Sequence, residues 1–373
     1  MSAVVLALAL LVQADRADDP TRLPPEVQRL CDLALHDRAE ETMRETIRKA
    51  LVDPQYQKHV PKLRAALCEI LLAARRFPEL KQEAEVLRQN KDPQLKALAS
   101  SFLAVAAWRA GEIPEALKAC DEAEKAASDR SATAFPDVRR RVRAIRAYAG
   151  WKRHESATHL LHFPPDSPLA ADPAAFGRRL DQAFERIRAS LNVAFEGKIE
   201  AFFFNDQAQA DAIVGQALDF ALPRERAYFA RHDSAVGYGM ASVVAFYAAN
   251  RREKLPPQLP GLVEGFAAAQ TDDPLWNRRR DEIPRRLKKK GSLRPLAELL
   301  AEPAGNAEYF AVAGSFVRWM IRARGAEKFA QLWAEFNDHA KREADSPDLL
   351  APWIRVHGSS LAELEKAWRS SIR

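Results

Sequence analysis

Apolar residues recur every three or four positions through most of the first 150 residues, which is the spacing of one buried helical face. Leu63, Leu67, Ile70 and Leu71 show it, and so does the run that includes Leu98. The pattern is interrupted at Asp53-Pro54, Phe77-Pro78, Asp92-Pro93, Gly111 and Phe135-Pro136. Proline and glycine at these points are typical helix boundaries. The pattern therefore predicts a domain of short helical hairpins over residues 22–150.

One stretch of this helical region is repeated. The sequence AARRFPEL at 73–80 is similar to AWRAGEIPEAL at 107–117, and the matched prolines, Pro78 and Pro114, lie 36 residues apart. This period and the second copy resemble a tetratricopeptide repeat, with Trp108 and Gly111 where the first helix of a hairpin meets its turn. The resemblance implies a short stack of two to four hairpins. Two interpretations stay open: a peptide-binding solenoid, or hairpins that brace a second domain.

The pattern changes at Trp151, where short apolar runs begin to alternate with amphipathic segments. Runs of strand type occur at 158–163, 198–204 and 227–231. Helical patterns occur at 173–191, 206–214 and 234–250. Strands and helices in this order predict an α+β domain over residues 155–373. The whole chain is therefore expected to be mainly α, with helical-hairpin repeats followed by an α+β domain.

Three segments of the second domain carry a family resemblance. They are LPGLVEGFA at 259–267, YFAVAGSFVRW at 309–319 leading to Arg324-Gly325, and GSSLAELEKAW at 358–368. Together with the order of the elements, they resemble the gluzincins, the thermolysin-like (peptidase MA-like) zinc peptidases, in the bacterial branch whose catalytic domain follows tetratricopeptide-like repeats. The resemblance covers roughly residues 155–373. It implies a peptidase-like fold with a cleft that holds an extended peptide.

The motif that binds zinc in that family is absent. In HExxH, two histidines on one helical face bind the metal and the glutamate acts as the general base. On the matching helix, Tyr238 and Ser242 replace the histidines and Gly239 replaces the base. Glu264 corresponds to the glutamate ligand, and Tyr309 belongs to the next matching segment. We therefore expect a vestigial cleft at these five residues, with no catalytic residue, no metal and no cofactor.

Other candidate ligands and nucleophiles are weaker. His159 and His162 lie three apart on a predicted strand and so point to opposite faces. His232 precedes an acid, but the position four residues later is Val236, which leaves too few ligands for zinc. The three cysteines, an odd number, are Cys31, Cys68 and Cys120. We expect buried free thiols, the alternative being one disulfide and a lone thiol in an exported chain.

Composition and charge narrow the class of protein. Hydrophobic residues make up 47% of the chain and charged residues 29%, with 14 glycines in 373 residues. These values exclude a disordered chain, a collagen-like fibre and a multi-spanning membrane protein. The net charge is 57 − 51 = +6. The strongest basic cluster comprises Arg278, Arg279, Arg280, Arg285, Arg286, Lys288, Lys289 and Lys290.

The basic cluster allows two interpretations. It is a binding surface for an anionic envelope polymer, or a solvated helical face with Asp281 and Glu282 as partners. Aromatic residues do not interleave the cluster, so base stacking has no support and no nucleic acid is expected.

The first residues predict export. An apolar run from Ala3 to Val12 is followed by Gln13-Ala14 and then by charge, which is typical of a signal peptide over residues 1–14, although no Lys or Arg precedes it. The alternative is a buried N-terminal helix. No later run of eighteen apolar residues occurs, so no transmembrane segment is expected in the mature chain, and its location is expected to be periplasmic or secreted.

The sequence as a whole predicts an exported, non-catalytic peptidase-like protein (a pseudopeptidase) with a helical-repeat domain that binds a protein or peptide. The alternatives are a zinc-dependent peptidase with an unorthodox site and a purely structural helical-repeat protein.

Overall fold

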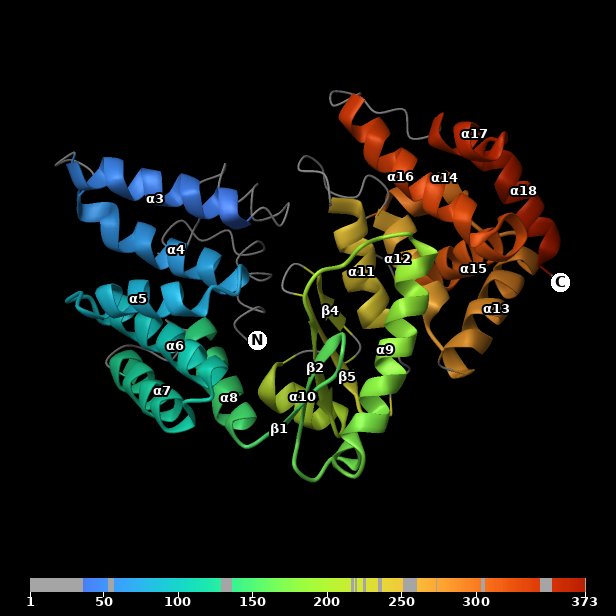
Figure 1. Ribbon diagram of the computed structural model, residues 1–373. Helices are drawn as coiled ribbons and strands as arrows, with labels where there is room; N and C mark the ends of the chain where they lie inside the picture. The colour runs from blue at the N-terminus through green and yellow to red at the C-terminus, as the bar shows by residue number, and fades with distance from the viewer. Residues whose placement is uncertain are drawn as a thin grey trace. The chain divides into compact units, whose positions relative to one another are not determined.

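The computed structural model describes residues 36–52, 57–128, 136–215, 218, 220–223, 226–233, 237–250, 260–272, 274–302, 306–342 and 351–372 (Figure 1). The chain is mainly helical with a small five-stranded sheet, which confirms the predicted fold class. It divides into two compact units. The predicted signal segment, Cys31 and the predicted break at Asp53-Pro54 lie outside the described residues.

The first unit contains the N-terminal helices together with His162–Ala170 and Phe204–Leu218. Each helix packs against the next along the chain (Figure 1). The helices are α3 (His36–Val52), α4 (Val60–Ala73), α5 (Phe77–Arg88), α6 (Pro93–Ala110), α7 (Ile113–Ser128) and α8 (Pro136–Ala149), with a 3₁₀ turn at Gln57–His59. Cys68 on α4 and Cys120 on α7 are buried free thiols, as predicted for these two cysteines.

Two helix ends in this unit share one backbone geometry. Arg75 after α4 and Gly111 after α6 both have left-handed φ angles, of 63° and 80°, and lie 36 residues apart. In each turn a backbone N–H donates a hydrogen bond to the carbonyl oxygen five residues earlier, as in a Schellman cap. These bonds join Arg76 N to Leu71 O at 2.8 Å and Glu112 N to Ala107 O at 2.9 Å. The 36-residue period of the sequence is therefore also the spacing of two equivalent turns.

The sheet has the strand order β1-β2-β3-β5-β4, so among the described residues β4 lies at one edge. The strands are β1 (Lys152–Glu155), β2 (His159–Phe163), β3 (Ile199–Phe204), β4 (Phe220–Leu222) and β5 (Ala227–Arg231). Every residue of β2 and β3 is buried, and eight of the eleven residues are apolar, as expected for buried strands. β4 pairs antiparallel with β5, and Ala221 lies opposite Tyr228.

Helix α9 (Pro173–Ser190) carries a carboxylate that holds the turn between β1 and β2. Asp181 Oδ1 accepts hydrogen bonds from Ser156 Oγ at 2.7 Å and from the backbone N of Thr158 at 3.0 Å. On β2, the His159 ring packs edge-on against Phe184, whereas the His162 ring lies 5.3 Å from Trp108. The two histidines thus have different neighbours, in agreement with the three-residue spacing.

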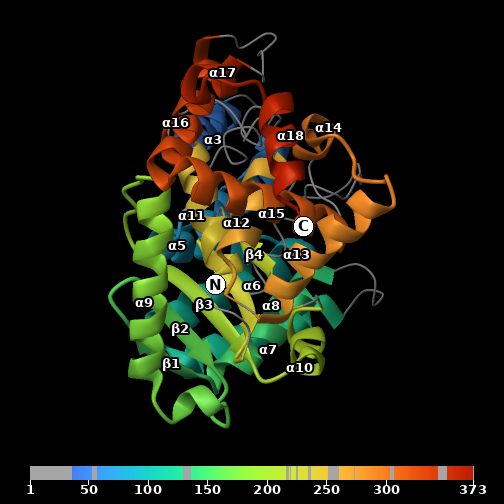
Figure 2. The same cartoon turned by 90° about the vertical axis from the view of Figure 1, so that its right-hand side faces the viewer.

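The second unit is completed by the helices of the C-terminal half (Figure 2). They are α11 (Tyr238–Asn250), α12 (Pro260–Gln270), α13 (Pro274–Lys289), α14 (Leu296–Ala301), α15 (Ala307–Arg324), α16 (Ala326–Arg342), α17 (Ala351–His357) and α18 (Leu361–Ser371); short helices α10 (Gln207–Ile213) and Pro168–Ala170 belong to the first unit. Helix α12 packs between α11 and α15 (Figure 2).

Small residues allow α12 and α15 to approach closely. A Cβ atom added at Gly265 would lie 3.0 Å from the Ala313 backbone, and one at Gly314 would lie 2.9 Å from the Ala268 side chain. Any larger residue at these positions would push the helices apart. Because Gly265 follows Glu264 directly, this close contact positions the part of α12 that carries Glu264 against α15.

Candidate functional site

Three side chains of the predicted cleft come together where α11 faces α12. Tyr238 and Ser242 lie one helical turn apart on α11, and Glu264 lies on α12. The Tyr238 hydroxyl donates a hydrogen bond of 2.7 Å to Glu264 Oε2. Ser242 is buried beside them. The i,i+4 spacing explains the placing of the first two residues, because such residues share one face of a helix.

Burial is the main influence on the protonation of this pair. Burial raises the pKa of Glu264, and the hydrogen bond from Tyr238 partly offsets that rise. Burial also raises the pKa of Tyr238, the negative charge of Glu264 adds to the effect, and Ser242 acts in the opposite direction. Tyr238 therefore keeps its proton at neutral pH and acts as a donor.

These residues line a pocket of about 680 Å³, named below the Tyr238–Glu264 pocket. Its walls are largely aromatic, with Tyr228, Phe310 and Trp276 among the lining residues. The edge strand β4 contributes Phe220 and Ala221 to the same lining, and Arg279 of α13 completes it with a cation. A concave, mainly apolar space with a few polar groups is typical of a ligand site.

Gly239 and Tyr309 are the other two residues of the predicted cleft. A Cβ atom at Gly239 would lie 2.7 Å from Tyr228 Cβ, so this position has no room for a side chain unless β5 moves. Tyr309 is buried, and its hydroxyl donates to the carbonyl of Glu302 at 3.0 Å. Its neighbour Phe310, rather than Tyr309, is among the residues that line the pocket.

The residues of the pocket do not fit a zinc ion. Zinc sites in proteins take three or four ligands from Cys, His, Asp and Glu. Among the described lining residues, Glu264 is the one side chain of these types, and its carboxylate already accepts a hydrogen bond from Tyr238. No group of three such side chains suited to a metal occurs anywhere in the described part of the chain.

The predicted basic cluster lies on α13, with Lys290 directly after it, and divides into three kinds of residue. Arg280 is buried and donates to the carbonyls of Ala268 and Ala269 at the end of α12, so it is not available to a partner. Lys288 donates to carbonyls at the end of α18, and Arg286 pairs with Glu308 at 2.7 Å. The remaining members are exposed: Arg278, Arg279, Arg285, Lys289 and Lys290.

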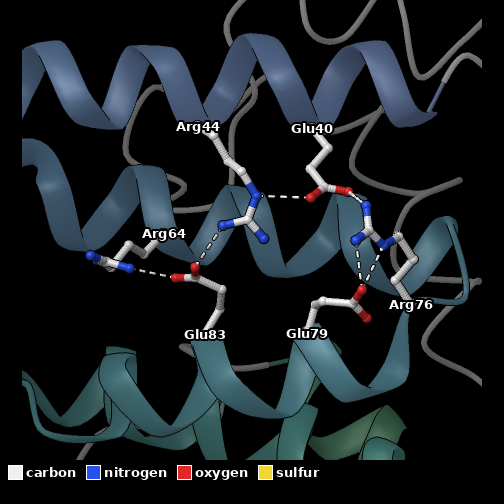
Figure 3. Close-up of polar contacts among 6 residues, drawn as sticks. All are labelled: Glu40, Arg44, Arg64, Arg76, Glu79 and Glu83. Atoms are coloured by element: carbon white, nitrogen blue, oxygen red, sulfur yellow. Dashed lines mark hydrogen bonds and ion pairs between the residues drawn. The ribbon is translucent and has the colours of Figure 1, made fainter.

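A second polar cluster lies in the N-terminal unit (Figure 3). Positive and negative side chains alternate across α3, α4 and α5 in the order Arg64, Glu83, Arg44, Glu40, Arg76 and Glu79. The i,i+4 spacing of Glu40 and Arg44 is visible in the sequence. The ion pair between Arg76 and Glu40, which lie 36 residues apart, cannot be predicted from the sequence. The charges satisfy one another, so the cluster serves to join the three helices.

Searches of protein-family models, curated proteins and solved structures return no match to this chain. Within the described residues, every helix is too short or too polar to cross a membrane. The features of this chain that bear on function are therefore the Tyr238–Glu264 pocket and the basic helix α13 beside it.

Proposed function

We propose that the second unit binds an extended peptide segment of a partner protein in the Tyr238–Glu264 pocket and leaves it uncleaved. The observation that carries this proposal is the position of β4, which is both the edge of the sheet and part of the pocket lining. An edge strand can add a peptide through main-chain hydrogen bonds, while a neighbouring pocket selects a side chain.

The chemistry of the pocket supports an apolar anchor. Tyr228, Trp276 and Phe310 offer aromatic surface to a large aliphatic or aromatic side chain. Tyr238 donates to Oε2 of Glu264 and so orients this carboxylate, whose second oxygen can accept a hydrogen bond from a polar group of the peptide. The ligand is thus a short extended segment with one apolar side chain in the pocket.

Two features favour binding over hydrolysis. Position 239, where the resembling peptidases carry their general base, has no space for a side chain against Tyr228. Tyr238 and Ser242, in the places of the two histidines, are protonated hydroxyl groups that cannot replace imidazole as zinc ligands. We include in the proposal that the chain acts outside the cytoplasm, because of the signal-like segment over residues 1–14.

The test is affinity selection from a synthetic library of nine-residue peptides on the full chain, with mass spectrometry of the retained peptides. Ala221→Trp and Ser242→Leu each place a larger side chain in the pocket, from β4 and from α11. Ala362→Trp, at an exposed position of α18, is the matched control. We expect the wild type and the control to retain intact peptides with a large apolar residue, and the two pocket variants to lose them.

The alternatives give different results. A zinc peptidase would yield shortened peptides, a loss of cleavage with a chelator, and close to one equivalent of zinc by elemental analysis. A purely structural protein would retain no peptide better than the pocket variants do. Either result contradicts the proposal.

A further inference from the structure

We propose that the peptide is acidic, with its apolar residue in the Tyr238–Glu264 pocket and acidic residues next to it along the exposed basic face of α13. This inference deepens the proposed function and rests on it. The observation behind it is that Arg279 belongs to both features: it lines the pocket, and it is the first exposed cation of a row on α13.

The row follows from helical geometry. Arg286 follows Arg279 by seven residues and Lys290 follows it by eleven. At 100° per residue, the three residues lie within about 20° of one line along the helix. Lys290 directly follows the last residue of α13. At a rise of 1.5 Å per residue the row is about 16 Å long. An extended peptide covers that length with about five residues.

The charges of this row are available for a partner. Arg279 and Lys290 are exposed and take part in no ion pair within the described residues. Arg286 pairs with Glu308, but both side chains are about half exposed, at 54% and 47%. A second row, Arg278, Arg285 and Lys289, is also exposed on the adjacent face and strengthens the positive field. Like charges this close repel one another, and an anionic ligand relieves that repulsion.

The pocket makes a peptide a better partner than another polyanion. A polysaccharide or a lipid headgroup could meet the cations of α13, but neither has the extended main chain that can pair with the edge strand β4 beside the pocket. Helix α13 packs against α15, and of the residues from Arg278 to Lys290 the apolar Ile283, Pro284 and Leu287 are buried or partly buried. The exposed face therefore has charge without the apolar surface that inserts into a bilayer.

The experiment uses the full chain and peptides retained in the selection described above. The first readout is composition: retained peptides should be enriched in Asp and Glu on one side of the apolar residue. The second is the dissociation constant of one such peptide, measured by fluorescence anisotropy, for the wild type and for Arg279→Gln, Arg286→Gln and Lys290→Gln. Lys366→Gln, an exposed lysine on α18, is the matched control.

We expect each of the three variants to weaken binding about two- to fivefold, with no change for the control. A peptide with Gln in place of each acid should bind about tenfold more weakly or worse, and raising the salt from 50 to 300 mM should reduce this difference. Retained peptides without acidic enrichment would overturn this inference and leave the proposed function intact. If no peptide is retained, the proposed function itself fails. Binding to vesicles of anionic phospholipid, with none to the acidic peptide, would also overturn the inference.

Discussion

The hydrogen bond between Tyr238 and Glu264 gives a prediction that depends on pH. Replacing Tyr238 by Phe removes one hydroxyl and leaves the ring, so the change isolates the 2.7 Å bond to Glu264 Oε2. A hydrogen bond to a charged group contributes about 1.5–3 kcal/mol. We therefore expect Tyr238→Phe to lower the free energy of unfolding by about 2 kcal/mol when Glu264 is ionised, and pH 8 is chosen to favour that form.

The pH dependence has a definite sign. Burial raises the pKa of Glu264 in the folded state, so above the unfolded value of about 4.5 the folded state binds its proton more strongly than the unfolded state does. Stability from this group therefore falls as the pH rises through the folded pKa. Tyr238→Phe removes the hydrogen bond that lowers the pKa of Glu264, so the folded-state pKa rises further. The pH range over which stability falls then extends to higher pH. The destabilisation should be smaller at pH 5 than at pH 8.

Urea unfolding monitored by tryptophan fluorescence at the two pH values measures this effect. Tyr309→Phe is the matched control, because its hydroxyl donates to the neutral carbonyl of Glu302. That variant should lose about 1 kcal/mol at both pH values. In the Glu264→Gln background, the pH dependence of Tyr238→Phe should disappear. Equal losses for Tyr238→Phe at pH 5 and pH 8, no larger than those of the control, would refute the assignment.

Three further predictions concern the rest of the molecule. Arg141 and Glu69 form a fully buried ion pair, so Arg141→Leu should lower the free energy of unfolding by about 3–5 kcal/mol. Adding Glu69→Leu should restore most of that loss in urea unfolding. Equal stability of the single and double variants would contradict this. Gly111→Ala should lower the free energy of unfolding by about 1 kcal/mol because the left-handed φ of 80° disfavours a side chain, although the added Cβ meets nothing within 4 Å. Gly150→Ala is the control, and equal shifts of the melting temperature in the two variants would contradict this prediction. Burial, with Arg324 and Lys328 nearby, lowers the pKa of His357 to about 4, so stability falls as the pH drops from 6.5 towards 4. His357→Phe should reduce the loss of stability between pH 7 and pH 5 by about 2 kcal/mol, and an unchanged loss would rule the idea out.

Local patterns in the sequence account for much of the fold. The apolar runs at 158–163, 198–204 and 227–231 correspond to β2, β3 and β5, and the helix predicted at 173–191 corresponds to α9. Strands β1 and β4 were not predicted. β1 is the polar segment KRHE, with no apolar alternation, and β4 has only three residues, so neither gives a periodic signal.

The site shows where sequence reasoning ends. The spacing of Tyr238 and Ser242 places them on one helical face, and Glu264 was expected near them from the family resemblance. Their contact, however, depends on the packing of α12 between α11 and α15, which is not local in the sequence. The role of Gly239 depends on Tyr228 of β5, and the joining of Arg279 to the pocket depends on where α13 packs. Such contacts between distant segments leave no periodic pattern.

We propose above that the Tyr238–Glu264 pocket holds an uncleaved peptide segment. The most direct test of this proposal is the titration of one selected fluorescent peptide into the full-length wild type, Ala221→Trp and Ala362→Trp, with mass spectrometry of the peptide after equilibration. We expect saturable binding to the wild type and to Ala362→Trp, at least tenfold weaker binding to Ala221→Trp, and a peptide of unchanged mass. Equal binding to all three proteins, or a shortened peptide, would contradict the proposal.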